Sequence, residues 1–136
     1  MHKALIIDDE PAIQQLFRYV LEEAEFEVQV ACNGLEGLSA LASGPVDIIL
    51  LDVSMPEMDG RQFVAELMRR SARDQRLAEI PFVVMTGENF MESGLNRTFS
   101  AAPGFVCFLP KMTPPELVLE KVKEAMCRPP SAGCDR

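Results

Sequence analysis

Five polar side chains lie at or just after the ends of short apolar runs in this sequence. They supply three carboxylates, a hydroxyl and an amine. Asp8 and Asp9 directly follow a short apolar run, and Asp52 follows a second one. Thr86 ends a third run, and Lys111 comes two residues after a fourth. Short apolar runs of this kind are typical of strands buried on both faces, so each side chain is expected at the carboxyl end of a strand.

The chemistry that these residue types favour is transfer of a phosphoryl group assisted by a metal ion. Three carboxylates in one crevice repel each other unless a divalent cation lies among them, or unless one is protonated with a raised pKa. Mg²⁺ is favoured when water and phosphate complete its oxygen ligands. With Asp52 as the nucleophile, Lys111 as a cation and Thr86 as a hydroxyl donor, the set has what an in-line transfer requires.

Each of these residues also has a simpler interpretation when it is taken alone. Asp8 or Asp9 is suited to capping a helix, and Asp52 to starting a turn. Thr86 is suited to a strand-end turn, and Lys111 to the solvated surface. The occurrence of the whole set at strand ends favours the chemical interpretation.

The elements that must position these residues follow from the hydrophobic pattern. Strands are expected at residues 4–7, 27–31, 46–51, 81–85 and 105–109, with 27–31 nearer an edge. Helical spacing of apolar residues is found around 11–21, 34–41, 63–68 and 115–126. This alternation predicts an α/β, doubly wound fold, in which a five-stranded parallel sheet carries helices on both faces. In such a sheet the carboxyl ends of the strands converge on one crevice.

Two segments do not fit this pattern easily. Residues 71–79 are polar and charged, and are expected to form either an extended helix end or a loop. Residues 88–103 should hold the fourth crossover helix. Because Ser93-Gly94 interrupts this segment, the helix is predicted to be short or irregular.

Composition limits the class of protein. The chain has 136 residues, of which 48% are hydrophobic, enough for one domain with a packed core. The net charge of −8 argues against nucleic-acid binding by this domain. Four cysteines without a CxxC pair and a single histidine argue against structural zinc and favour reduced thiols. No apolar run is long enough to span a membrane and no signal peptide is present, so a cytoplasmic protein is expected.

Over about residues 3 to 127, the sequence resembles the receiver domain of two-component response regulators. The most specific match is residues 51–60, Leu-Asp-Val-Ser-Met-Pro-Glu-Met-Asp-Gly, which is similar to the phosphorylation-site segment. Residues 7–11, Ile-Asp-Asp-Glu-Pro, resemble the acidic segment of that family. Residues 84–87 and 108–111 match the segments that carry its threonine and its lysine.

The resemblance implies a strand order 2-1-3-4-5 and a role for each residue at the acidic site. Asp52 would be the phosphoacceptor. Asp9 and Asp52 would bind Mg²⁺ directly, together with the backbone carbonyl of Ser54, and Asp8 would act mainly through water.

Further roles are implied for the residues around the phosphoryl group. Lys111 would pair with this group or with Asp52. Thr86 would donate a hydrogen bond to a phosphoryl oxygen, and Phe108 would then swing inward as part of a switch. Ser54 and Glu88 would flank the path of the water that hydrolyses the phosphorylated state, and so tune its lifetime.

The sequence departs from the family pattern after the lysine. The family usually has proline there, whereas Met112 follows Lys111 and Pro110 precedes it. The segment from Thr86 to Lys111 is also longer than usual. Both departures fall at the fourth helix and fifth strand, which normally form the signalling face in this family, while the phosphorylation site is matched throughout.

The residues at the strand ends allow three functions. The favoured one is a signalling receiver domain at residues 1–127, which is not an enzyme but assists its own phosphorylation and dephosphorylation. Its phosphodonor would be a sensor histidine kinase or a histidine phosphotransfer domain; the output partner is unknown and homodimerisation is left open. The alternative is a Mg²⁺-dependent phosphohydrolase with an Asp nucleophile, but Ser54 stands where such enzymes place a second Asp. A receiver-like interaction module would normally lack Asp52 or Lys111.

Residues 128–136 are predicted to be a flexible tail or the start of a linker.

Overall fold

The computed structural model of the chain describes residues 2–87 and 99–127, and it contains one parallel sheet of five strands. The strands are β1 (Lys3–Ile7), β2 (Glu27–Ala31), β3 (Ile48–Asp52), β4 (Phe82–Thr86) and β5 (Phe105–Pro110). They are ordered β2-β1-β3-β4-β5, so the predicted order is confirmed, and β2 is an edge strand as expected.

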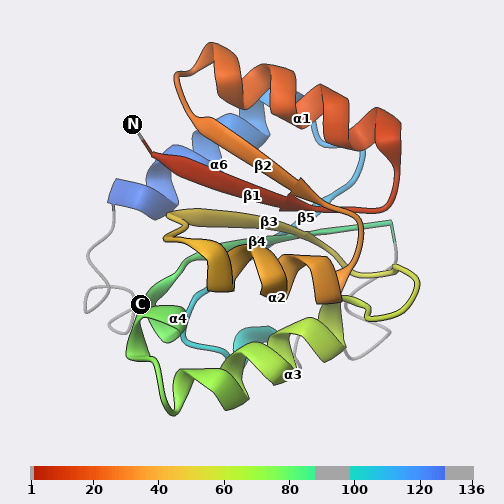
Figure 1. The fold of residues 1–136 in the computed structure, drawn as a ribbon. Coiled ribbons are helices and arrows are strands. Elements are labelled where there is room, and N and C mark those ends of the chain that lie inside the picture. The colour runs from red at the N-terminus through yellow and green to blue at the C-terminus, as the bar shows by residue number, and fades with distance from the viewer. Residues whose placement is uncertain (1, 88–98, 128–136) are drawn as a thin grey trace.

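Helices cover both faces of this sheet (Figure 1). They are α1 (Pro11–Glu23), α2 (Gly34–Ser43), α3 (Gly60–Ser71), α4 (Gln75–Glu79) and α6 (Pro115–Cys127). In Figure 1, α1 and α6 lie above the sheet, and α2, α3 and α4 lie below it. The predicted doubly wound α/β fold is therefore confirmed. None of the helices in the described part of the chain is both long and apolar enough to cross a membrane.

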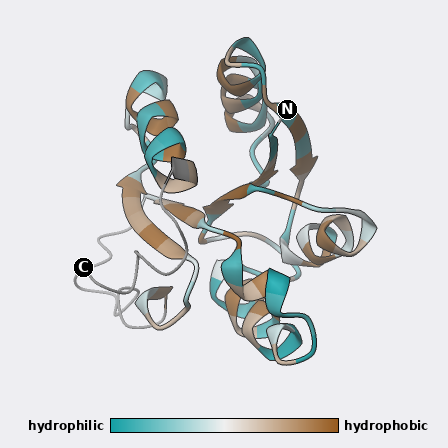
Figure 2. Ribbon diagram, turned by 90° about the vertical axis from the view of Figure 1, so that its left-hand side faces the viewer, coloured by the Kyte–Doolittle hydropathy of each residue, from teal (hydrophilic) through white to brown (hydrophobic). Residues whose placement is uncertain are grey.

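The apolar faces of the helices pack onto the strands (Figure 2). All five residues of β3 and of β4 are buried, as expected for central strands covered on both faces. On one face Phe17 and Leu21 of α1 pack with Val122 of α6, and on the other Phe63 of α3 is fully buried. Each such side chain stabilises the fold by about 1.5–3 kcal/mol relative to its exposed state.

The sheet register places the ends of β1, β3, β4 and β5 at one edge. Ile7 pairs with Leu51, Asp52 pairs with Met85, and Thr86 pairs with Pro110. Residues that directly follow or end these strands are consequently neighbours in space, although they are far apart in sequence.

Segment 71–79, for which a helix end or a loop was expected, has a different structure. Helix α3 ends at Ser71, and a separate short helix, α4, follows before β4. Asp74 caps the N-terminus of α4, because its side chain accepts a hydrogen bond from the backbone N–H of Arg76. Most of the predicted crossover segment, residues 88–98, and the predicted tail, residues 128–136, lie outside the described residues.

Candidate functional site

The predicted carboxylates lie together at the carboxyl edge of the sheet. Asp8 follows β1 and Asp52 ends β3, and both are buried, with exposed fractions of 3% and 2%. Asp9 is exposed on the solvent side of the same cluster. One carboxylate oxygen from each of the three residues can be chosen so that all lie within 4.8 Å of one another.

This carboxylate cluster fits a hard divalent cation. Oxygen ligands at this separation suit Mg²⁺, which takes a few protein carboxylates and completes its coordination with water and phosphate. Asp52 Oδ2 adds a second observation, because it is buried and accepts no hydrogen bond among the described residues, although the Lys111 ammonium lies 3.1 Å away. A buried oxygen of this kind is costly unless something binds it, and a cation would do so.

Lys111 places its amine among the same carboxylates. Its Nζ lies 3.1 Å from Asp52 Oδ2 and 3.7 Å from Asp8 Oδ2. The contact with Asp52 is an ion pair that is not aligned as a hydrogen bond. The shortest contact is with Glu10 Oε1, at 2.6 Å, and here the amine donates a hydrogen bond.

Sequence reasoning missed Glu10. Glu10 directly follows the Asp8-Asp9 pair, at the N-terminus of α1, and contacts the same Lys111 amine that lies beside Asp52. Its backbone N–H also donates to Asp8 Oδ1 at 2.9 Å, which fixes the orientation of that carboxylate. A third consecutive acidic residue was the available signal, but sequence alone does not tell which way its side chain points.

The charges of the site perturb each other. Burial, and next the charge of Asp8, raise the pKa of Asp52 to about 6, although Lys111 opposes this rise. Burial also raises the pKa of Asp8. Burial acts to lower the pKa of Lys111, but the hydrogen bond to Glu10 and the charge of Asp52 outweigh it, and this pKa is raised. A divalent cation among the carboxylates, or a proton on one of them, would each relieve the repulsion between Asp8 and Asp52. These are the two alternatives that the sequence left open.

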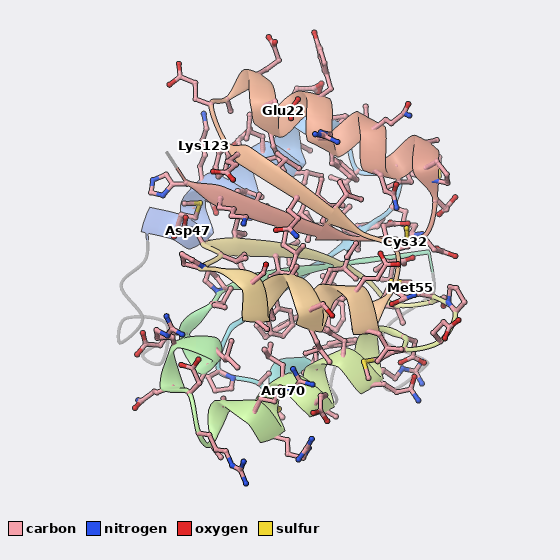
Figure 3. All side chains as sticks on the ribbon, in the orientation of Figure 1. Glu22, Cys32, Asp47, Met55, Arg70 and Lys123 are labelled. Atoms are coloured by element: carbon pink, nitrogen blue, oxygen red, sulfur yellow. The ribbon has the colours of Figure 1, made fainter. Side chains whose placement is uncertain are left out.

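The loop after Asp52 is anchored at both of its ends. The Gly60 N–H donates to the Val53 carbonyl at 2.8 Å, and the Gly34 N–H of α2 donates to the Met58 carbonyl at 2.9 Å. Asp59 closes a capping box with Gln62, which fixes the first turn of α3. The side chain of Ser54, within this loop, is exposed. In Figure 3, Met55 of this loop and Cys32, which follows β2, are both labelled at the right-hand side of the molecule.

Thr86 and Phe108 occupy the neighbouring strand ends. Thr86 is buried, and its carbonyl accepts a hydrogen bond from the Lys111 N–H at 3.1 Å, which couples β4 to the lysine. The half-buried ring of Phe108 packs against Phe105 and Phe99, with ring centroids 4.9 Å and 5.8 Å away. Glu88 lies outside the described residues.

The chain belongs to the response regulator receiver domain family. The model of this family, described as the response regulator receiver domain, matches residues 4–123. This match, together with the parallel sheet and the acidic site, confirms the family resemblance seen in the sequence.

Individual relatives agree with this assignment. The chain is 33% identical over 106 residues to a DNA-binding dual master transcriptional regulator, RpaA, of Synechocystis, covering 78% of this chain and 42% of that protein. It is 37% identical over 113 residues to a protein-glutamate methylesterase/protein-glutamine glutaminase of Rhodospirillum rubrum, covering 82% of this chain and 28% of that protein. The chain therefore spans less than half the length of these two curated relatives.

Among solved structures, the chemotaxis response regulator CheY4 of Vibrio cholerae is similar, with a TM-score of 0.79 and 30% identity. The match covers 92% of this chain and 98% of CheY4. The response regulator TrrA of Thermotoga maritima, solved in complex with Mg²⁺-BeF, has a TM-score of 0.74 and 28% identity over 92% of this chain and 99% of that one.

Asp9 provides a direct test of whether this cluster binds Mg²⁺. Asp9→Asn removes one charge and one candidate anionic ligand, so we expect Mg²⁺ affinity to fall about tenfold or more, since even groups that only support metal ligands have effects of this size. Titration of Mg²⁺ followed by NMR or calorimetry measures the change. Glu57→Gln, an exposed charge loss in the neighbouring loop, is the control. Equal affinities for Asp9→Asn and wild type would remove Asp9 from the site.

Proposed function

We propose that this receiver domain accepts a phosphoryl group on Asp52, with Mg²⁺ bound by the neighbouring carboxylates. The observation that carries the proposal is the placement of Lys111 Nζ and of the Asp8 and Asp9 carboxylates around the buried Asp52. Asp9 and Asp52 are proposed as direct Mg²⁺ ligands with the Ser54 carbonyl, and Asp8 as a ligand through water. The solved structure of TrrA with Mg²⁺-BeF is in keeping with such a site in a similar fold.

Each residue would contribute to one transfer step. A carboxylate oxygen of Asp52 attacks the phosphorus of the donor, forming an acyl phosphate while the bond from phosphorus to the leaving group breaks. Lys111 would exchange its contact with Asp52 for one with a phosphoryl oxygen, and Thr86 would donate its hydroxyl to another. A bound Mg²⁺ supplies positive charge that offsets the charge on the phosphoryl oxygens.

The partners and setting of the domain are proposed on the same basis. A sensor histidine kinase or a histidine phosphotransfer domain would be the donor, and an output domain or separate protein would read the phosphorylated state. One relative is the sensor histidine kinase GacS of Pseudomonas protegens, which is 34% identical over 84 residues, covering 62% of this chain and 9% of that protein. We infer a cytoplasmic setting, because such donors act there, and an independently folding domain over residues 1–127.

A phosphorylation assay tests the proposal against the phosphohydrolase alternative. Incubation with acetyl phosphate and Mg²⁺ should add a single phosphoryl group per chain, detected by intact mass, and chelation of the metal should prevent it. A receiver domain keeps the phosphoryl group on Asp52 until that group is hydrolysed. A phosphohydrolase should instead release phosphate from aryl phosphates repeatedly. Rapid turnover of such substrates without a labelled chain would contradict the proposal. Ser54 and Glu88 are proposed to tune the lifetime of the label.

The switch is a separate prediction. A phosphoryl group adds negative charge and three acceptor oxygens, so the Thr86 hydroxyl should move toward it and leave space for the ring of Phe108. A ring without a hydroxyl loses no hydrogen bond to water on moving inward. Its further burial is enough to shift a two-state equilibrium about tenfold.

NMR spectra with and without beryllofluoride measure this shift. We expect perturbations at Phe108 and at its neighbours Phe99 and Phe105, in addition to those at the carboxylates. In Thr86→Ala the mimic should still bind, but the perturbations at the three rings should disappear. Ring signals that do not respond in the wild-type protein would exclude the switch.

A further inference from the structure

A groove between α2, α3 and α4 lies away from the phosphorylation site. Its main hollow has a volume of about 260 Å³, and a smaller one of about 80 Å³ adjoins it. The two hollows share Leu41 and Leu77, both half-buried, and together they form what we call the α2–α4 groove. The main hollow is lined by Leu38, Leu41, Ala42, Arg70, Arg73, Asp74 and Leu77.

This groove lies at the far end of α3 from the acidic site. Helix α3 begins at Gly60, beside Asp52, and ends at Ser71, so it separates the two by about 18 Å at 1.5 Å per residue. None of the residues that line the groove contributes to the acidic site. A ligand in the groove would therefore leave Asp52 accessible.

Positive charge is concentrated along the groove. Residues 69–76 contain four arginines and one aspartate, in a chain whose net charge is −8. Arg70 and Arg73 line the main hollow, and Arg76 lines the smaller one. In Figure 3 the labelled Arg70 side chain lies between α2 and α3. The rim of the α2–α4 groove is therefore basic, although the domain as a whole is acidic, and the bottom of the groove is apolar.

Most of these charges are already paired, and one is not. Arg69 and Arg70 both donate to Glu66, whose pKa is lowered to about 2 by these hydrogen bonds. The carboxylate of Asp74 is held by Arg76 at 3.0 Å. The exposed Arg73 guanidinium makes no ion pair or hydrogen bond with the described residues, so it is the cation available for an added anion.

We propose that the α2–α4 groove binds an acidic amphipathic helix of a partner protein. The apolar residues of such a helix, spaced at i and i+3 or i+4, would occupy the two hollows, which share one leucine-lined floor. Its carboxylates would face Arg73 and the outer edges of Arg70 and Arg76. An apolar centre with a polar rim, and enrichment in arginine, are features of protein–protein interfaces. A basic peptide would instead be repelled at this edge.

Selection from a phage-displayed library of random peptides on the full chain tests the proposal. We expect the enriched peptides to be acidic, with apolar residues at helical spacing. Synthetic versions of these peptides should bind about tenfold or more weakly to Arg73→Glu, because the free cation becomes an anion. They should lose as much affinity for Ala42→Trp, in which the indole occupies the main hollow.

The control reverses a charge elsewhere. Arg18→Glu changes an exposed arginine of α1, on the other face of the sheet, and should leave peptide binding unchanged. Because Arg73 is exposed, its variant should fold even if Ala42→Trp does not, and labelling of Asp52 checks folding in each case. Enrichment of only basic or neutral peptides, no enrichment, or equal binding to Arg73→Glu would overturn the proposal. Binding of phosphatidylglycerol vesicles that is lost in Arg73→Glu, without peptide enrichment, would also overturn it and identify a membrane as the occupant.

Discussion

Asp52→Asn is expected to abolish phosphoryl labelling and, at the same time, to stabilise the unphosphorylated protein. An amide does not form an acyl phosphate, so the mass of the variant should not change with acetyl phosphate and Mg²⁺. Asn keeps the shape of the side chain, which is 2% exposed, but removes a charge from a buried cluster. Loss of function and gain of stability would then have one cause.

The sign of the stability effect follows from the pKa of Asp52. In the folded protein this pKa is raised to about 6, chiefly by burial, whereas in the unfolded chain it is about 3.9. The folded state therefore holds the proton more tightly. Its stability falls as pH rises through the window between these values, and the loss remains above it, up to about 3 kcal/mol. Asn abolishes this loss, so at neutral pH the variant should be about 1–3 kcal/mol more stable, less whatever Lys111 loses with its partner.

Urea unfolding between pH 4 and pH 8 measures this difference. The wild-type protein should lose stability over the window between pH 4 and 6, and the variant should lose less. Asp47→Asn, the same change at the opposite end of β3, is the matched control because Asp47 is half exposed and an amide still accepts the hydrogen bond from Lys3. If Asp52→Asn were labelled like the wild type, Asp52 would not be the phosphoacceptor. Equal stability of the variant and the wild type at every pH would show that Asp52 carries no charge penalty.

The acidic site was predictable from sequence because a parallel sheet converts a local rule into a spatial one. Asp8, Asp52 and Lys111 each follow an apolar run, and the register of four strands brings those ends together whatever the distance along the chain. No long-range information about side chains is needed for this inference. The family resemblance then supplied the strand order and the role of each residue.

Features that depend on side-chain direction were not predictable in this way. Glu10 is adjacent to a recognised pair, yet its hydrogen bond to Lys111 depends on a side-chain conformation and on a residue 101 positions away. The α2–α4 groove depends on how segment 71–79 folds, and its polar composition was compatible with two structures. Only the position of α4 shows that Leu77 and Leu41 line a common hollow.

Gly60→Ala is expected to destabilise the protein strongly, through a change close to the acidic site. A Cβ at this position would meet the backbone carbonyl oxygen of Asp52 at 2.5 Å and the Cα of Val53 at 3.0 Å. Both are backbone atoms, so no side-chain rotation relieves the contact. Either α3 or the end of β3 must shift, at a cost of about 3 kcal/mol, the upper part of the range for overpacking.

The same shift should slow phosphorylation, because the carbonyl that is displaced belongs to the proposed acceptor. The hydrogen bond from the Gly60 N–H to Val53, at 2.8 Å, would also be strained. Thermal unfolding together with the rate of labelling by acetyl phosphate measures both effects. Gly44→Ala is the matched control, since a Cβ there meets no atom within 4 Å and the backbone is extended. That variant should be neutral or slightly more stable. If Gly60→Ala behaved like Gly44→Ala, the close approach of α3 to the end of β3 would not constrain the site.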